Sequence, residues 1–121
     1  MTKRILVIED TEDNRQIVRD LLTSVGYELI EAADGLAGVA IAERERPDLI
    51  LMDIQLPGID GYEATRRIRA IPELAGTPII AVTSYALSGD EAKTRAAGCD
   101  AYVAKPFSPR QLLATIRQFV P

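Results

Sequence analysis

The chain has 121 residues, the length of one ordinary domain, and 47% of them are hydrophobic, which is enough to bury a core. Its 14 Lys and Arg against 18 Asp and Glu give a net charge of −4, and this argues against a general nucleic-acid binder, which needs a basic face. Because the chain has no histidine and one cysteine, Cys99, a zinc site, a Ser-His or Cys-His catalytic pair and an internal disulfide are excluded.

The first half of the chain predicts two strands and two helices in alternation. Ile5–Ile8 is an unbroken aliphatic run, which is typical of a strand covered on both faces. Polar and apolar residues alternate more regularly in Tyr27–Ala33 than in this run, which predicts an edge strand. Leu36–Glu45 predicts a helix that Pro47 ends. Between the two strands, apolar residues with a helical period are expected to face the core before a C-cap at Gly26: Ile17, Val18, Leu21, Leu22 and Val25.

The second half continues the same alternation. Leu49–Met52 and Ile79–Val82 are again aliphatic runs typical of buried strands, and Ala101–Ala104 is a weaker candidate. Three helices are predicted to start where a capping serine or aspartate precedes a helical stretch, at Asp60–Glu63, Ser88–Glu91 and Ser108–Gln111. The last of them carries a second apolar stripe: Leu112, Leu113, Ile116, Phe119 and Val120.

Five strands alternating with five helices predict an α/β fold. Right-handed crossovers favour one parallel sheet with helices on both faces. No linker, repeat or low-complexity segment divides the chain, so residues 1–121 are expected to form a single domain. The aliphatic runs are too short to span a bilayer and no signal peptide is visible, so we expect a cytoplasmic protein without a membrane or nucleic-acid partner.

Polar side chains follow four of the predicted strands. Glu9 and Asp10 end the first strand, Asp53 the third and Thr83 the fourth, and Lys105 comes after the fifth. Ligands of open parallel sheets bind at the carboxyl ends of the strands, so these groups are expected to meet at one edge.

Each of these residue types has a use at such an edge. Carboxylates held close together repel one another unless a cation lies among them, and ligation by oxygen alone suits Mg²⁺. A carboxylate beside the ion can attack phosphorus and form an acyl phosphate, and a lysine can neutralise the phosphoryl oxygens. Taken singly, an aspartate after a strand is often a turn former or a helix cap. Their co-occurrence favours a site.

Four segments, in this order and at these spacings, resemble the receiver (response-regulator) domain of bacterial two-component signalling from about Lys3 to Val120. They are Ile5–Asp10, Pro47–Gly61, Pro78–Thr83 and Gly98–Phe107. The resemblance implies a flavodoxin-like, doubly wound fold with a five-stranded sheet of order 2-1-3-4-5. It also implies a phosphorylated signalling switch that catalyses only its own phosphotransfer and slow dephosphorylation, not a conventional enzyme.

The resemblance also implies a role for each residue at the edge. Asp53 would accept a phosphoryl group from phosphohistidine on a histidine kinase or a histidine phosphotransfer protein. Mg²⁺ would be bound by Asp53, by Asp10 with Glu9 beside it, and by the backbone carbonyl of Gln55. Lys105 would contact the phosphoryl group, and the peptide bond between it and the following proline is expected in cis.

A switch is implied as well. Thr83 would turn toward the phosphoryl group, and Tyr102 would swing into the space that it vacates. A downstream protein target is then expected on the surface of the fourth helix, fifth strand and fifth helix, including parts of Ser88–Ala97 and Pro109–Val120. The kinase is expected at the start of the first helix, near Asn14–Gln16. The alternative to this switch role, on the residues alone, is that Tyr102 is an ordinary aromatic residue of an edge strand with its hydroxyl in solvent.

One departure from the family pattern is visible. The acidic pair is Glu9-Asp10, where many members have two aspartates. Because glutamate is one methylene longer, Glu9 is expected to reach the metal through water.

Several alternatives stay open at this point. The chain ends after the last predicted helix and Thr83–Glu91 is similar to single-domain receivers of cell-division and polarity control, so a stand-alone regulator is expected, with a receiver cut from a larger regulator as the alternative. An aspartyl phosphatase is disfavoured because Gln55 stands where a second aspartate is needed. A flavodoxin-like flavin binder is disfavoured because Glu9 and Asp10 would face an anionic cofactor.

Overall fold

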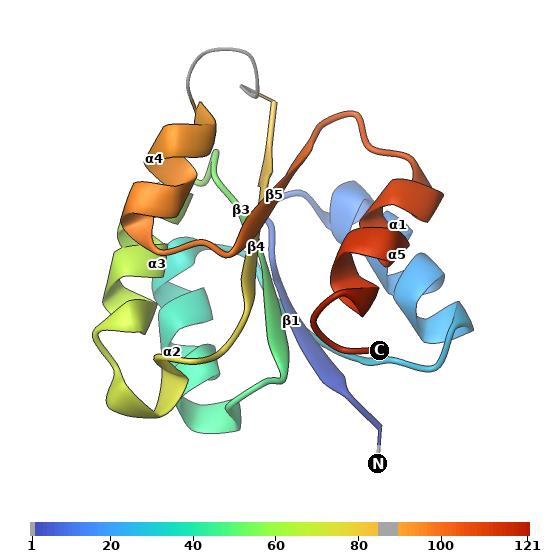
Figure 1. Cartoon of the computed structure of the whole chain (residues 1–121), viewed down its shortest axis with the longest axis horizontal. Coiled ribbons are helices and arrows are strands. Elements are labelled where there is room, and N and C mark those ends of the chain that lie inside the picture. The colour runs from blue at the N-terminus through green and yellow to red at the C-terminus, as the bar shows by residue number, and fades with distance from the viewer. Residues whose placement is uncertain (1, 85–89) are drawn as a thin grey trace.

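The chain folds around one parallel sheet that is covered by helices on both faces (Figure 1). The computed structural model describes residues 2–84 and 90–121. Its elements are β1 Arg4–Ile8, α1 Glu12–Ser24, β2 Glu28–Ala32, α2 Gly35–Glu45, β3 Leu49–Asp53, α3 Gly61–Arg69, the short 3-10 helix η1 Pro72–Leu74, β4 Ile79–Thr83, α4 Asp90–Ala97, β5 Ala101–Ala104 and α5 Pro109–Arg117. The strand order β2-β1-β3-β4-β5, parallel throughout, confirms the predicted fold class and topology.

The two faces of the sheet carry separate cores. In Figure 1, α1 and α5 lie on one side of the sheet, and α2, α3 and α4 lie on the other. Because successive strand residues point to opposite faces, Ile5 and Val7 pack with α1 and α5, whereas Leu6 and Ile8 pack on the opposite side. This two-sided burial is the physical reason why β1, β3 and β4 show no polar alternation, whereas the edge strand β2 carries Glu28 and Glu31.

The predicted helix ends are largely confirmed. The side chains of Asp60 and Ser108 accept hydrogen bonds from main-chain N–H groups in the first turns of α3 and α5, as predicted. Asp34, which was not predicted as a cap, does the same for α2. Gly26 follows α1 with φ +96°, and Arg46 ends α2 in a left-handed conformation directly before Pro47. The predicted cap at Ser88 lies outside the described residues. None of the helices in the described ranges is both long and apolar enough to cross a membrane.

The predicted inward stripe of α1 is only partly correct. Val18 and Leu22 are buried, but Ile17 and Val25 are 57% and 39% exposed. Residues 17 and 21 lie four apart along one line of the helix, about 100° away from the line of residues 18 and 22, and Val25 is the non-helical residue that follows the last turn. The line of residues 17 and 21 runs along the margin of the contact with the sheet. Leu21 therefore packs against the core, while Ile17 stays exposed.

Gly61 allows α3 to begin directly against the main chain at the end of β3. A Cβ at this position would lie 2.6 Å from Ile54 Cα and would also collide with the carbonyl oxygen of Asp53. The N–H of Gly61 donates to the carbonyl of Ile54 at 3.0 Å. The start of α3 therefore fixes the main chain that carries the Asp53 side chain.

We expect Gly61→Ala to destabilise the protein by about 1–3 kcal/mol, the usual cost of forcing atoms into a filled space. Gly76→Ala is the control, since a Cβ there meets nothing within 4 Å. Urea unfolding of both variants measures the difference. Equal midpoints for the two variants would show that the contact is unimportant.

Candidate functional site

The alternation of side chains along each strand decides on which face of the sheet each polar group at the carboxyl edge lies. Glu9 continues the positions of β1 that face α1 and α5, and Asp53 and Lys105 share this face on β3 and after β5. Asp10 and Thr83 belong to the opposite alternation, toward α2, α3 and α4. The site therefore straddles the end of the sheet, with a carboxylate on each side of it.

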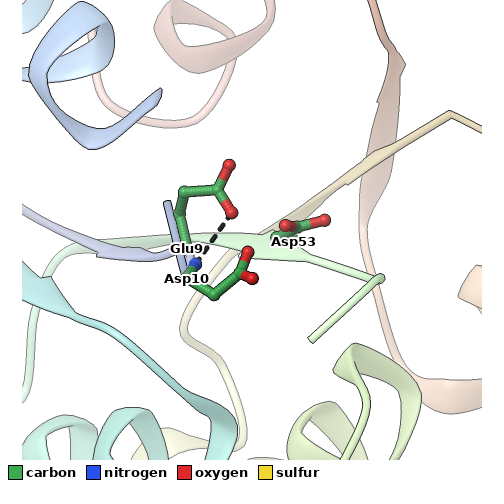
Figure 2. Close-up of side chains that lie close together, drawn as sticks. All are labelled: Glu9, Asp10 and Asp53. Atoms are coloured by element: carbon green, nitrogen blue, oxygen red, sulfur yellow. Dashed lines mark hydrogen bonds between the residues drawn. The ribbon is translucent and has the colours of Figure 1, made fainter. Parts of the chain in front are cut away.

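Three carboxylates form a cluster at this edge (Figure 2). One oxygen from each of Glu9, Asp10 and Asp53 lies within 4.8 Å of the others. Glu9 and Asp53 are 5% and 4% exposed, whereas Asp10 is open to solvent. In Figure 2 the Glu9 and Asp10 side chains leave the end of β1 in different directions, with the Glu9 carboxylate above, the Asp10 carboxylate below and Asp53 to the right of both.

Lys105 supplies a positive charge to the cluster. Its Nζ lies 3.3 Å from Asp53 Oδ1 and 3.6 Å from Glu9 Oε1. Asp53 Oδ1 also accepts a hydrogen bond from the main-chain N–H of Gln55 at 3.0 Å. The peptide bond between Lys105 and Pro106 is cis, which confirms the sequence-based expectation.

The Glu9 carboxylate is held by α1 and by its own neighbour. Its Oε1 accepts from Asn14 Nδ2 at 2.7 Å, and its Oε2 accepts from the N–H of Asp10 at 2.8 Å. Burial raises the pKa of Glu9 above its ordinary value, and the Asp53 carboxyl raises it further, while Asn14 and Lys105 act in the opposite direction.

The net charge of the site favours a cation. Three carboxylates face one lysine, so two negative charges are left when all four groups are ionised. The donors are all oxygens, with an exposed aspartate on the solvent side, and this set suits a hard divalent ion such as Mg²⁺ in an open site. The pKa of Glu9 is raised first by burial and then by the neighbouring Asp53 carboxyl, so the excess of negative charge adds to the effect of burial.

The remaining predicted residues lie around this cluster. Thr83 is fully buried at the end of β4, and Tyr102 on β5 is half-buried against the core beneath α2, α3 and α4. Gln55 is exposed and lines a polar cavity of about 560 Å³ together with Asp10. The structure thus brings Glu9, Asp10, Asp53, Gln55 and Lys105 together, while their roles in binding and transfer stay predictions.

Two features were not predicted from the sequence. One is an apolar cavity of about 560 Å³ between the sheet, α1 and α5, with Val7, Val18, Leu51 and Leu112 among its lining residues. The other is the attachment of α1 to Glu9. The sequence places Asn14 and Arg15 beside the acidic cluster, but only the folded chain shows that both of them bond Glu9.

Comparison with known proteins identifies the family. Residues 5–117 match the response regulator receiver domain family. The polar-differentiation response regulator DivK of Brucella ovis is 43% identical over 120 residues, which are 99% of this chain and 98% of that protein.

Solved structures agree with this match. The magnesium-bound receiver domain of sensor histidine kinase PA1611 from Pseudomonas aeruginosa is 42% identical, with a TM-score of 0.92 and 98% of each chain covered. Chemotaxis protein CheY4 of Vibrio cholerae is 30% identical, with a TM-score of 0.94 over 99% of this chain and 100% of that chain. The chain belongs to the response regulator receiver domain family of two-component signalling, whose members are signalling switches.

Proposed function

We propose that the protein accepts a phosphoryl group on Asp53 from phosphohistidine of a histidine kinase or a phosphotransfer protein, in the cytoplasm and in a Mg²⁺-dependent reaction. The observation that carries this proposal is the position of Asp53. Its carboxylate lies in a cluster of three carboxylates and 3.3 Å from a lysine ammonium. A nucleophile, the donors for a metal ion and a cation for phosphoryl oxygens therefore meet at one point.

The transfer needs one bond to form and one to break. A carboxylate oxygen of Asp53 attacks phosphorus, the bond from phosphorus to the imidazole nitrogen breaks, and that nitrogen leaves with the electron pair. Lys105 is close enough to Asp53 to neutralise the oxygens of the phosphoryl group during transfer. The N–H of Gln55 holds the Asp53 carboxylate in place. We propose that the protein catalyses only its own phosphotransfer and slow dephosphorylation.

Mg²⁺ fits the donor set at this edge. Asp10, Asp53 and the backbone carbonyl of Gln55 would hold the ion, and Glu9, whose two oxygens are bonded to Asn14 and to the Asp10 N–H, would act through water. When bound, the ion supplies positive charge to the phosphoryl oxygens. The related receiver domain of sensor histidine kinase PA1611 holds a magnesium ion in its active-site cleft.

We further propose that Thr83 and Tyr102 transmit the phosphorylation to a downstream protein target on the α4–β5–α5 face. Thr83 pairs with Ala104, and Tyr102 pairs with Ala81, so both lie on the face beneath α4, two positions apart. Of the predicted output face, residues 88 and 89 lie outside the described part of the chain.

Polarity or cell-division control is the regulatory setting that we propose first. The chain covers 98% of a polar-differentiation regulator at 43% identity. A receiver within a sensor kinase is the second candidate, supported by the 42% identity to the receiver domain of PA1611. In either setting, the start of α1, near the acidic cluster, is the surface proposed for the kinase.

Incubation with a small phosphodonor and Mg²⁺ is expected to add one phosphoryl group, because Asp53 is the nucleophile. Intact mass spectrometry measures the addition. No phosphoryl group is expected on Asp53→Asn, or on wild type in the presence of EDTA. The control is Asp20→Asn, which changes an exposed position of α1 and is expected to be modified like wild type. Full modification of Asp53→Asn would contradict the proposal.

Mg²⁺ is expected to raise the thermal midpoint of the unphosphorylated protein, because the ion relieves repulsion among the three carboxylates. A free Mg²⁺ concentration of about ten times Kd corresponds to about 1.4 kcal/mol of stabilisation. Asp10→Asn is expected to show a smaller shift at the same concentration in differential scanning fluorimetry. A wild-type midpoint that does not respond to Mg²⁺ would argue against metal binding here.

Thr83→Val is expected to keep phosphorylation of Asp53 but to lose the response at Tyr102, because the hydroxyl that follows the phosphoryl group is gone. NMR spectra before and after phosphorylation report on the Tyr102 amide and ring. Thr77→Val, just before the start of β4, is the control. If Tyr102 responds equally in wild type and Thr83→Val, the two residues are not coupled.

A further inference from the structure

Arg15 connects α1 to the main chain of the acidic cluster. Its Nη1 donates to the carbonyl oxygen of Glu9 at 2.7 Å, and its Nη2 donates to Glu12 Oε2 at 2.7 Å. Its Nε lies 3.3 Å from Glu31 Oε1 on β2. The Arg15 side chain is 15% exposed, so this arginine is largely packed within the structure and is not a freely solvated surface charge.

The bond to Glu9 fixes one particular peptide group. The carbonyl of the Glu9–Asp10 peptide accepts from Arg15, and the N–H of the same peptide donates to the Glu9 carboxylate at 2.8 Å. Both polar ends of this peptide are therefore held. Because the peptide group is planar, its orientation sets the directions in which the Glu9 and Asp10 side chains leave the main chain (Figure 2).

The guanidinium of Arg15 is itself held by two carboxylates, Glu12 and Glu31, which Arg19 also binds. Arg19, one turn further along α1, donates to both oxygens of Glu31 at 2.8 Å and to Glu12 at 3.1 Å. The arginines lower the pKa of Glu31 and Glu12, which therefore stay ionised at neutral pH. Arg19 shares the carboxylate partners of Arg15, but in the described structure only Arg15 of the two bonds the Glu9 carbonyl.

The start of α1 depends on the same contacts. Thr11 precedes the helix but its side chain makes no capping hydrogen bond. Instead, Asn14 bonds the Glu9 carboxylate and Arg15 bonds the Glu9 carbonyl. Two side chains from the first turns of α1 therefore bond both the carboxylate and the main-chain carbonyl of Glu9.

We propose that Arg15 is a positioning residue that sets the Mg²⁺ affinity of the site by orienting the Glu9–Asp10 peptide. The inference rests on the proposed function, since it assumes that Mg²⁺ binds at these carboxylates. Arg15 touches neither the ion nor the phosphoryl group in this account. It acts through the main chain that carries two of the three carboxylates, as partners of metal ligands commonly do.

The test compares Arg15→Ala with Arg19→Ala by Mg²⁺ titration, followed through the amide NMR signal of Asp10. Arg15→Ala is expected to weaken Mg²⁺ binding about tenfold, the lower end of effects seen for residues that support metal ligands. Arg19→Ala is expected to bind Mg²⁺ like wild type, because it removes the same charge from the same network without touching Glu9. Arg15→Lys keeps the charge and loses the planar fork of donors, and is expected to fall between wild type and Arg15→Ala.

The metal-free spectra provide a readout that does not depend on Mg²⁺. The Asp10 amide signal is expected to move in Arg15→Ala and to stay in place in Arg19→Ala. Unchanged Mg²⁺ affinity in Arg15→Ala, or an equal loss in both variants, would overturn the inference. A wild-type protein that does not bind Mg²⁺ would instead overturn the proposed function. If Arg15→Ala does not fold, as judged by circular dichroism, Arg15→Lys takes its place in the comparison.

Discussion

The repulsion among carboxylates at the carboxyl edge of the sheet is the constraint on which the site depends. Parallel strands bring Glu9, Asp10 and Asp53 together, and the fold keeps them there although burial and like charge both oppose it. Lys105 offsets part of this charge, and donors from Asn14 and the main chain of Gln55 hold two of the carboxylates. The remaining negative charge suits the edge to a divalent cation, and this is the physical basis of the proposal that Asp53 accepts a phosphoryl group there.

The fold positions these groups through the alternation of strand residues. Glu9, Asp53 and Lys105 share the face toward α1 and α5, which explains why the lysine reaches both carboxylates. Asp10 and Thr83 belong to the other face. A site that spans both faces is in contact, on one side, with the start of α1, the surface proposed for the kinase. On the other side it lies next to the β4–β5 region that carries Thr83 and Tyr102, the residues proposed to transmit the signal. Arg15 adds a link from α1 to the main chain of the cluster.

Much of this arrangement was predictable from the sequence, because it follows from short-range patterns. Aliphatic runs such as Ile5–Ile8 identify strands, and the polar residues after them identify the edge. The exposure of Ile17 was not predictable, because a helical period shows which residues share a side of a helix but not how wide the contact with the sheet is. The bonds from Asn14 and Arg15 to Glu9 depend on the angle at which α1 leaves the sheet, and local sequence does not determine that angle.

The most direct test of the central claim is the chemical identity of the phosphorylated residue. An acyl phosphate is an activated anhydride that hydroxylamine cleaves, whereas phosphate esters of serine, threonine and tyrosine resist it. Peptide mapping by mass spectrometry after this treatment should find a single hydroxamate, at Asp53. A phosphoryl group that survives hydroxylamine, or a hydroxamate at another carboxylate, would contradict the assignment of Asp53 as the acceptor.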